Sequence, residues 1–192
     1  LKIFFDRDDP DAENPATLCQ DMAFSLTDTD RGTFLHFCLE NMPVDREPED
    51  AARKAFEYGV AHGEVAVPED PGLRKNLLDA LTWFAKLPQS RHWLLDGLPE
   101  QPIMNENGKL LRMDNMVREP WGTLIIDYKS GGIYPTHIAQ VQEYINCLSQ
   151  CMGFEGKIYG LLIYLDEKCF RLVEAGKAHD PIDEIPQELP GA

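Results

Sequence analysis

The sequence predicts an α/β domain in which helices flank a mixed β-sheet and also make up the N-terminal portion. Residues 31–92 carry apolar positions at helical spacing, and from residue 93 onward short β-like runs separated by turns take over. The order is helices, three strands, one helix and two strands, which favours a mixed sheet over a doubly wound unit. The absence of a glycine-rich phosphate loop from the sequence agrees with that choice.

Composition limits the class of protein. A chain of 192 residues with 43% hydrophobic residues can form one globular domain with a sizeable core. No apolar run approaches the roughly 18–20 residues of a membrane span, and no signal peptide is recognisable, so we expect no membrane association. The 5 cysteines include no CxxC pair, which predicts reduced thiols, a cytoplasmic location and no iron–sulfur cluster. The start at Leu1 indicates a piece of a longer protein.

The formal net charge of −15 argues against a broad, non-specific nucleic-acid surface, which is normally basic. It does not argue against a metal-dependent nuclease, because a bound cation supplies positive charge locally. Any tight binding of DNA is then expected to depend on parts outside this chain.

The N-terminal portion should consist of an irregular acidic lead-in over residues 1–30 and three main helices. The first spans Arg31–Asn41, where Phe34, Leu35, Cys38 and Leu39 form an apolar stripe. The second runs to Gly63 from a start near Pro48, a residue favoured in the first helical turn. The third spans Leu73–Leu87 and ends before a proline.

The remainder should form the sheet and one long helix, Pro135–Met152. The predicted strands are Leu98–Met104, Lys109–Val117, Thr123–Lys129, Lys157–Tyr164 and Phe170–Glu174. Residues 105–108, Asn-Glu-Asn-Gly, give a hairpin signal between the first two strands. Residues 175–192 are rich in proline and acids and are expected to form a flexible tail.

A split acidic site is the main functional signal. Asp114 follows an apolar pair in one predicted strand, Asp127 follows a run of three apolar residues in the next, and Lys129 lies two residues beyond. A hairpin would bring both carboxylates to one end of neighbouring strands. Two carboxylates and a lysine suit a hard divalent cation or an activated water beside a phosphodiester. The alternative is a pair of strand-end acids that are only solvated or salt-bridged.

Further candidates flank this pair. Gln140 and Tyr144 are spaced i, i+4 on the helix that follows the Asp-Tyr-Lys strand, so the flank they form could look onto the acids. His36 is a suitable ligand type for Mn²⁺, and Glu100 opens the first predicted strand. The ordinary alternatives are a partly buried helix flank, a satisfied histidine and a solvated strand end.

In this order the motifs resemble the RecB-type branch of the PD-(D/E)XK nucleases. They are GTFLH (Gly32–His36), Glu100, LRMD ending at Asp114, IIDYKSG (Ile125–Gly131) and QVQEY (Gln140–Tyr144). The resemblance covers residues 31–174 and is greatest to the C-terminal nuclease domains of AddA-like, UvrD-related bacterial helicase–nucleases. Arg112, where a small residue is common, and Ser130, where threonine is common, depart from that pattern.

The resemblance implies a restriction-endonuclease-like fold with residues 31–92 mainly helical and residues 93–174 forming the catalytic core. It implies a Mg²⁺ or Mn²⁺ site whose ligands are His36, Asp114, Asp127 and the backbone carbonyl of Tyr128. It also implies catalytic roles for Asp114, Asp127, Lys129, Gln140 and Tyr144, with Glu100 as a supporting acid near the metal.

The function that the resemblance implies is metal-dependent, exonucleolytic hydrolysis of DNA during DNA end processing and recombinational repair by a helicase–nuclease. The implied partners are DNA, helicase motor domains of the parent chain and a partner subunit. Three alternatives stay open at this point. They are a catalytically silent nuclease fold that serves as an interaction or DNA-channel module, a stand-alone nuclease of the CRISPR-associated or phage type, and a metal-dependent hydrolase with another substrate.

Overall fold

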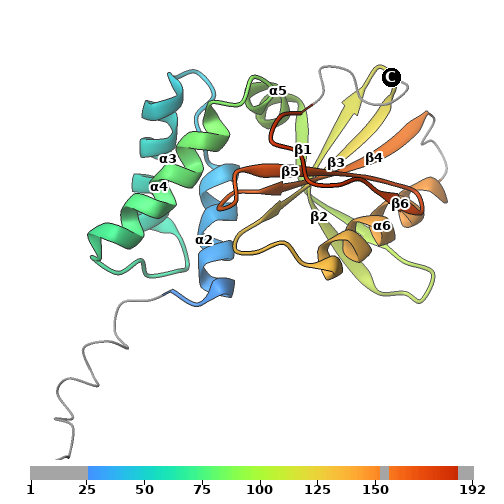
Figure 1. The fold of residues 1–192 in the computed structure, drawn as a ribbon, viewed down its shortest axis with the longest axis horizontal. Coiled ribbons are helices and arrows are strands. Elements are labelled where there is room, and N and C mark those ends of the chain that lie inside the picture. The colour runs from blue at the N-terminus through green and yellow to red at the C-terminus, as the bar shows by residue number, and fades with distance from the viewer. Residues whose placement is uncertain (1–25, 152–155, 186–192) are drawn as a thin grey trace, which may run out of the picture.

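The computed structural model describes residues 26–151 and 156–185 of the chain (Figure 1). The helices are α2 (Asp28–Glu40), α3 (Pro48–His62), α4 (Pro71–Ala85), α5 (Ser90–Asp96) and α6 (Pro135–Ser149). The strands are β1 (Gly97–Met104), β2 (Leu110–Glu119), β3 (Gly122–Lys129), β4 (Lys157–Tyr164), β5 (Cys169–Glu174) and β6 (Lys177–Ala178). The predicted α/β class with a mixed sheet is confirmed.

The strands form one sheet in the order β1-β2-β3-β4-β5-β6. The pairs β1–β2 and β2–β3 are antiparallel, β3–β4 is parallel, and β4–β5 and β5–β6 are antiparallel. The parallel pair requires a crossover, and α6 provides it. This connection places α6 directly after the end of β3.

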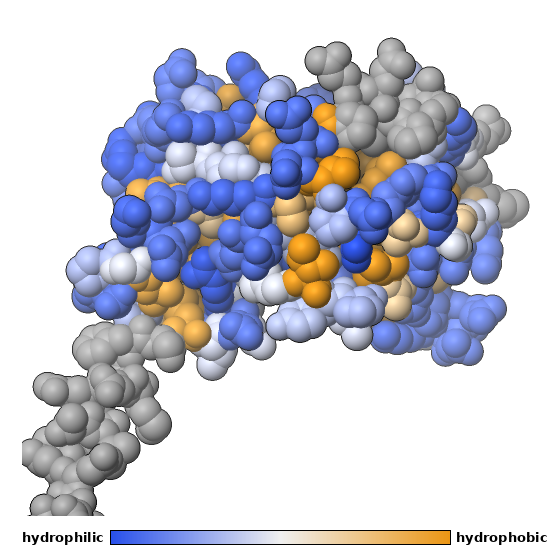
Figure 2. Space-filling model, viewed as in Figure 1, coloured by the Kyte–Doolittle hydropathy of each residue, from blue (hydrophilic) through white to orange (hydrophobic). Residues whose placement is uncertain are grey.

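Two apolar clusters pack on opposite faces of the sheet (Figure 1). Leu124 and Ile126 of β3 belong to the cluster that includes α2, α3 and α4, whereas Ile125 belongs to the cluster formed with α6. This alternation is what a strand buried on both faces produces. The outer face seen in Figure 2 is largely hydrophilic, in keeping with the net charge of −15.

The N-terminal helices begin at side-chain caps. Helix α2 starts at Asp28, three residues earlier than predicted, because the Thr27 hydroxyl accepts the backbone N–H of Asp30. Helix α4 starts at Pro71 because Asp70 accepts the N–H of Leu73 at 2.6 Å. The lead-in predicted over residues 1–30 is therefore helical from Asp28, and residues 1–25 lie outside the described part.

Two short elements were not predicted. Helix α5 directly precedes β1, which starts at Gly97, one residue before the predicted Leu98, and its Trp93 is buried beside Phe84 of α4. Strand β6 pairs with β5, and residues Phe170 and Ile182 exchange two backbone hydrogen bonds of 2.8 Å. The part of the predicted tail up to residue 185 is therefore attached to the sheet edge.

Helix α6 lies unusually close to β4 at Gly160. A methyl group added at Gly160 would overlap Val141 Cγ1 of α6, so only glycine allows this approach. The close packing fixes the helix that carries Gln140 and Tyr144. Among the helices that the structure describes, none has the length and apolar character needed to cross a membrane.

We expect Gly160→Ala to destabilise the protein by about 1–3 kcal/mol, because the added methyl group overpacks the α6–β4 contact. Urea unfolding measures this loss. The control is Val141→Ala in the same background, which removes the overlapping methyl groups and should restore part of the stability. A Gly160→Ala variant as stable as the wild type would mean that α6 is free to shift.

Candidate active site

Three acidic residues lie at one level across three neighbouring strands. In β1 and β2 the pairs Pro99–Asn115 and Gln101–Met113 bracket the facing residues Glu100 and Asp114. In β2 and β3 the register carried one position beyond Asn115–Ile126 places Asp114 opposite Asp127. The hairpin arrangement expected from the sequence is thus present.

The sheet opens at this level. The paired residues of β2 and β3 end at Asn115–Ile126, and instead of a backbone acceptor the Asp114 Oδ2 atom receives the N–H of Tyr128 at 2.7 Å. Strand β3 meanwhile stays paired with β4, where Asp127 faces Leu162. The separation of β2 from β3 makes room for the side chains of Asp114 and Asp127 between the two strands.

Lys129 stands at the end of a chain of directed contacts. Its Nζ atom lies 2.5 Å from Asp127 Oδ2 and donates to Gln140 Oε1 at 2.9 Å. Because lysine only donates, the Gln140 amide group must point its nitrogen away, and it donates to Tyr144 Oη at 2.7 Å. The Tyr144 hydroxyl then donates to the Arg112 carbonyl at 2.8 Å. Each side chain in this series of contacts is therefore oriented by the next one.

His36 reaches the opening from α2, on the other face of the sheet. Its Nε2 atom lies 3.0 Å from the carbonyl oxygen of Tyr128, and its Nδ1 atom lies 3.5 Å from Asp114 Oδ1. Burial lowers the pKa of His36, which favours the neutral imidazole. A carbonyl only accepts, so the proton belongs on Nε2, and the lone pair of Nδ1 faces a carboxylate oxygen. That pair of acceptors attracts a proton or a cation.

The two aspartates are short of positive charge. Burial raises the pKa of Asp114 to about 6. Burial and then the charge of Asp114 raise the pKa of Asp127 to about 7, although Lys129 opposes the shift. Apart from the Lys129 ammonium, 2.5 Å from Oδ2, the described residues offer no hydrogen-bond partner to either carboxylate oxygen of Asp127. An additional cation would satisfy these oxygens.

Mg²⁺ or Mn²⁺ fits the donor chemistry of this opening, which offers two carboxylates, a carbonyl oxygen and an imidazole. The atoms are not yet arranged as a cage: no three His, Cys, Asp or Glu side chains of residues 26–151 and 156–185 converge on one ion position. The Lys129 ammonium already contacts the Asp127 carboxylate, and the His36 imidazole already contacts the Tyr128 carbonyl oxygen. A bound ion would therefore have to take over the place of Lys129 at Asp127.

Arg31 and Asp166 form a clamp that was not recognised in the sequence. The Arg31 guanidinium makes two contacts with the Asp166 carboxylate, one of them Nε to Oδ2 at 3.0 Å, and the N–H of Gly131 donates to the same Oδ2 at 2.7 Å. Although burial opposes the shift, Arg31 and this amide lower the pKa of Asp166. The clamp ties α2, which carries His36, to the loop that follows Lys129. Arg31, Gly131 and Asp166 are far apart in the sequence and share no motif, so their contact is apparent only in the structure.

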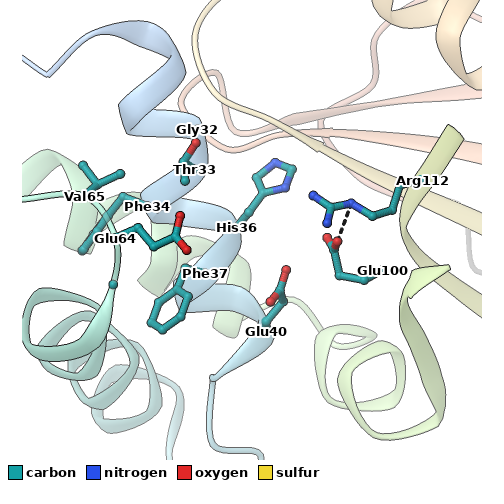
Figure 3. Close-up of a pocket in the computed structure, with 11 residues that line it drawn as sticks. Gly32, Thr33, Phe34, His36, Phe37, Glu40, Glu64, Val65, Glu100 and Arg112 are labelled. Atoms are coloured by element: carbon teal, nitrogen blue, oxygen red, sulfur yellow. Dashed lines mark ion pairs between the residues drawn. The ribbon is translucent and has the colours of Figure 1, made fainter. Parts of the chain in front are cut away.

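A large pocket lies beside the aspartates rather than on them (Figure 3). It measures about 630 Å³ and shares His36 with the opening, but neither aspartate nor Lys129 lines it. Glu100 lies on its far wall with a backbone φ of 55°, a left-handed value that is unusual for glutamate in a strand. The side chain of Glu100 pairs with Arg112 rather than with a ligand atom of the opening.

Comparison with known proteins adds no identity to this geometry. No known family model matches the chain, and no curated protein sequence matches it. The structure brings His36, Asp114, Asp127, Lys129, Gln140 and Tyr144 together and leaves Glu100 at the margin. What the site does must be inferred from these contacts.

We expect Asp127→Asn to raise the free energy of unfolding in EDTA at pH 8 by an amount on the order of 1 kcal/mol. Burial raises the pKa of Asp127 to about 7 in the fold from its ordinary value of 3.8. Its protonated form therefore stabilises the protein fully below pH 3.8, and that contribution is lost as the pH rises through about 7. The uncharged amide avoids this loss, so the gain should shrink from pH 8 to pH 5.

Urea unfolding at the two pH values measures this difference. Asp79→Asn, on the exposed part of α4, is the control for the change in net charge. A wild-type protein that is more stable than Asp127→Asn at pH 8 would show that Lys129 fully compensates the buried carboxylate.

Proposed function

We propose that the chain is a metal-dependent DNA nuclease domain that hydrolyses phosphodiester bonds at DNA ends. The observation that carries the proposal is the pair formed by half-buried Asp114 and buried Asp127, with Lys129 held 2.5 Å from Asp127 by Gln140. A buried acid paired with a largely covered lysine in an opening of the sheet is costly to maintain and is frequent in catalytic sites. The order of the sequence motifs agrees with this interpretation.

The residues divide the work as follows. Asp114, Asp127, His36 and the Tyr128 carbonyl would hold Mg²⁺ or Mn²⁺, which lowers the pKa of a bound water and offsets charge on the phosphate. Once Asp127 is neutralised in this way, Lys129 is free to turn toward the scissile phosphate or the attacking water. Lysine stabilises the developing charge there as a positioned cation.

Gln140 and Tyr144 would keep Lys129 aimed at the phosphate after it leaves Asp127. Gln140 offers lysine one acceptor, and Tyr144 fixes the orientation of that amide against the backbone of β2. The residual freedom of Lys129 is thereby confined to the direction of the opening. We further propose a parent helicase–nuclease with motor domains and a partner subunit, acting in the cytoplasm.

A second candidate function is a catalytically silent fold that guides DNA within a helicase complex. The lack of a ready-made metal cage among the described residues favours it. Titration with Mn²⁺ by calorimetry separates the two functions. Binding that is lost in Asp114→Ala favours the nuclease, and no binding favours the silent module.

Cleavage of labelled linear single- and double-stranded DNA tests the proposal directly. We expect activity with Mg²⁺ or Mn²⁺ and none in EDTA. The variants Asp114→Ala, Asp127→Asn and Lys129→Ala should each lower kcat by roughly 10²- to 10³-fold or more, because each removes charge at the reacting phosphate. Circular dichroism controls for folding. Normal cleavage by a folded Lys129→Ala protein would contradict the proposal.

Tyr144→Phe should lower kcat by roughly 10-fold while KM changes little. The variant keeps the packing of the ring but loses the hydroxyl that orients Gln140 and reaches the Arg112 carbonyl. Steady-state kinetics measure the effect. Tyr134→Phe, an exposed tyrosine at the start of α6, is the matched control. Equal effects of the two changes would mean that the hydroxyl of Tyr144 has no special part.

A further inference from the structure

The pocket beside the aspartates has three acids and a single lysine or arginine, Arg112, among the residues that line it (Figure 3). The acids Glu40, Glu64 and Glu100 come from three different segments, and His36 connects the pocket to the opening. These three carboxylates would repel a negatively charged nucleic-acid backbone. Arg112 is the place where a phosphate could be accepted.

Arg112 has a fixed backbone and an exposed side chain. Its carbonyl accepts the Tyr144 hydroxyl at 2.8 Å, and Asp114 follows two residues later on the same strand. Its side chain is 71% exposed. The backbone of Arg112 is therefore fixed next to the proposed reacting centre, whereas its guanidinium group can change conformation in solvent.

In the structure the Arg112 guanidinium is held by Glu100. Its Nε atom lies 2.5 Å from Glu100 Oε2, as the dashed line in Figure 3 shows. An ion pair with one highly exposed partner contributes little net stability, so exchanging the carboxylate for a phosphate is easy. A guanidinium binds phosphate oxygens with two parallel hydrogen bonds, which favours the exchange.

Glu100 is placed for this role at some cost to the backbone. Its φ of 55° interrupts the β1–β2 pairing opposite Asp114. Burial, then the charge of Glu100 and a hydrogen bond to it, raise the pKa of Glu40, which places the Glu40 carboxyl group in hydrogen-bond contact with Glu100. Glu100 would thus retain a partner after Arg112 leaves. A pair that served only to join β1 to β2 would need neither the strained backbone nor the second acid.

We propose that Arg112 binds a backbone phosphate of the DNA strand next to the phosphate being cleaved, and that Glu100 holds Arg112 in place when DNA is absent. This inference rests on the proposed nuclease function. It gives the site a second anchor, which sets the path of the strand from the aspartates along the edge of the pocket.

The test is the dependence of kcat/KM on salt concentration for a single-stranded oligonucleotide. Arg112→Ala should reduce the slope of log(kcat/KM) against log[salt] by about 0.7, the value for one lost phosphate contact. Arg112→Lys should retain most of the slope because the charge remains. Lys177→Ala is the control: it removes an exposed cation, also paired with a glutamate, from β6 at the opposite edge of the sheet, and should leave the slope unchanged.

Glu100→Gln provides a second arm. It should raise kcat/KM several-fold at low salt in the wild-type background, because Arg112 is released, and should raise it clearly less in the Arg112→Ala background, where only the repulsion by the carboxylate is removed. Anisotropy of the labelled oligonucleotide in Ca²⁺ should follow the same order of affinity. These results would support the inference.

Equal slopes for the wild type, Arg112→Ala and Lys177→Ala would overturn it, as would a gain from Glu100→Gln that is equally large without Arg112. In either case a wild type that cleaves beside an inactive Asp127→Asn leaves the proposed function standing. A wild type that is inert with every metal would instead contradict the proposed function, and the inference with it.

Discussion

Burial of Asp127 is the constraint on which the site depends. Its side chain is 0% exposed in the middle of the sheet, and burying a carboxylate without adequate partners is strongly unfavourable. Among the described residues, Lys129 is the cation in contact with it. The lysine is itself nearly buried, so its position must be held by others, and Gln140 and Tyr144 do this. The contacts that surround Asp127 thus follow from the need to keep one charge in the core.

The topology decides how these contacts can be made. The crossover from β3 through α6 to β4 places Gln140 and Tyr144 next to the end of β3 by chain connectivity alone. His36 has no such connection, since it comes from α2 on the other face. The clamp of Arg31 and Asp166 supplies it by joining α2 to the loop after Lys129. The two faces of the sheet therefore meet only where β2 and β3 separate.

The parts of the site that are local in sequence could be predicted, and the parts that depend on distant contacts could not. Asp127 and Lys129 lie in one strand, and the i, i+4 pair lies on the helix that follows it. Their spacing in the sequence therefore predicts that these side chains lie close together. Arg31 and Asp166 are 135 residues apart and carry no shared pattern. The same limit applies to the fold. Helix α5 has 7 residues, too few for a stripe, and β6 exists only because the edge of β5 is available.

The pairing of charges explains how an acidic chain could act on a polyanion. Both cations near the opening are already bound to acids: Lys129 to Asp127, and Arg112 to Glu100. In this state the site presents no net positive charge, so it does not attract nucleic acid at long range. On the proposed function, Asp127 would hold a divalent cation in place of Lys129, and Arg112 would hold a phosphate in place of Glu100. Affinity for the strand would then depend on both exchanges, so that binding at the reacting position would not need a basic surface.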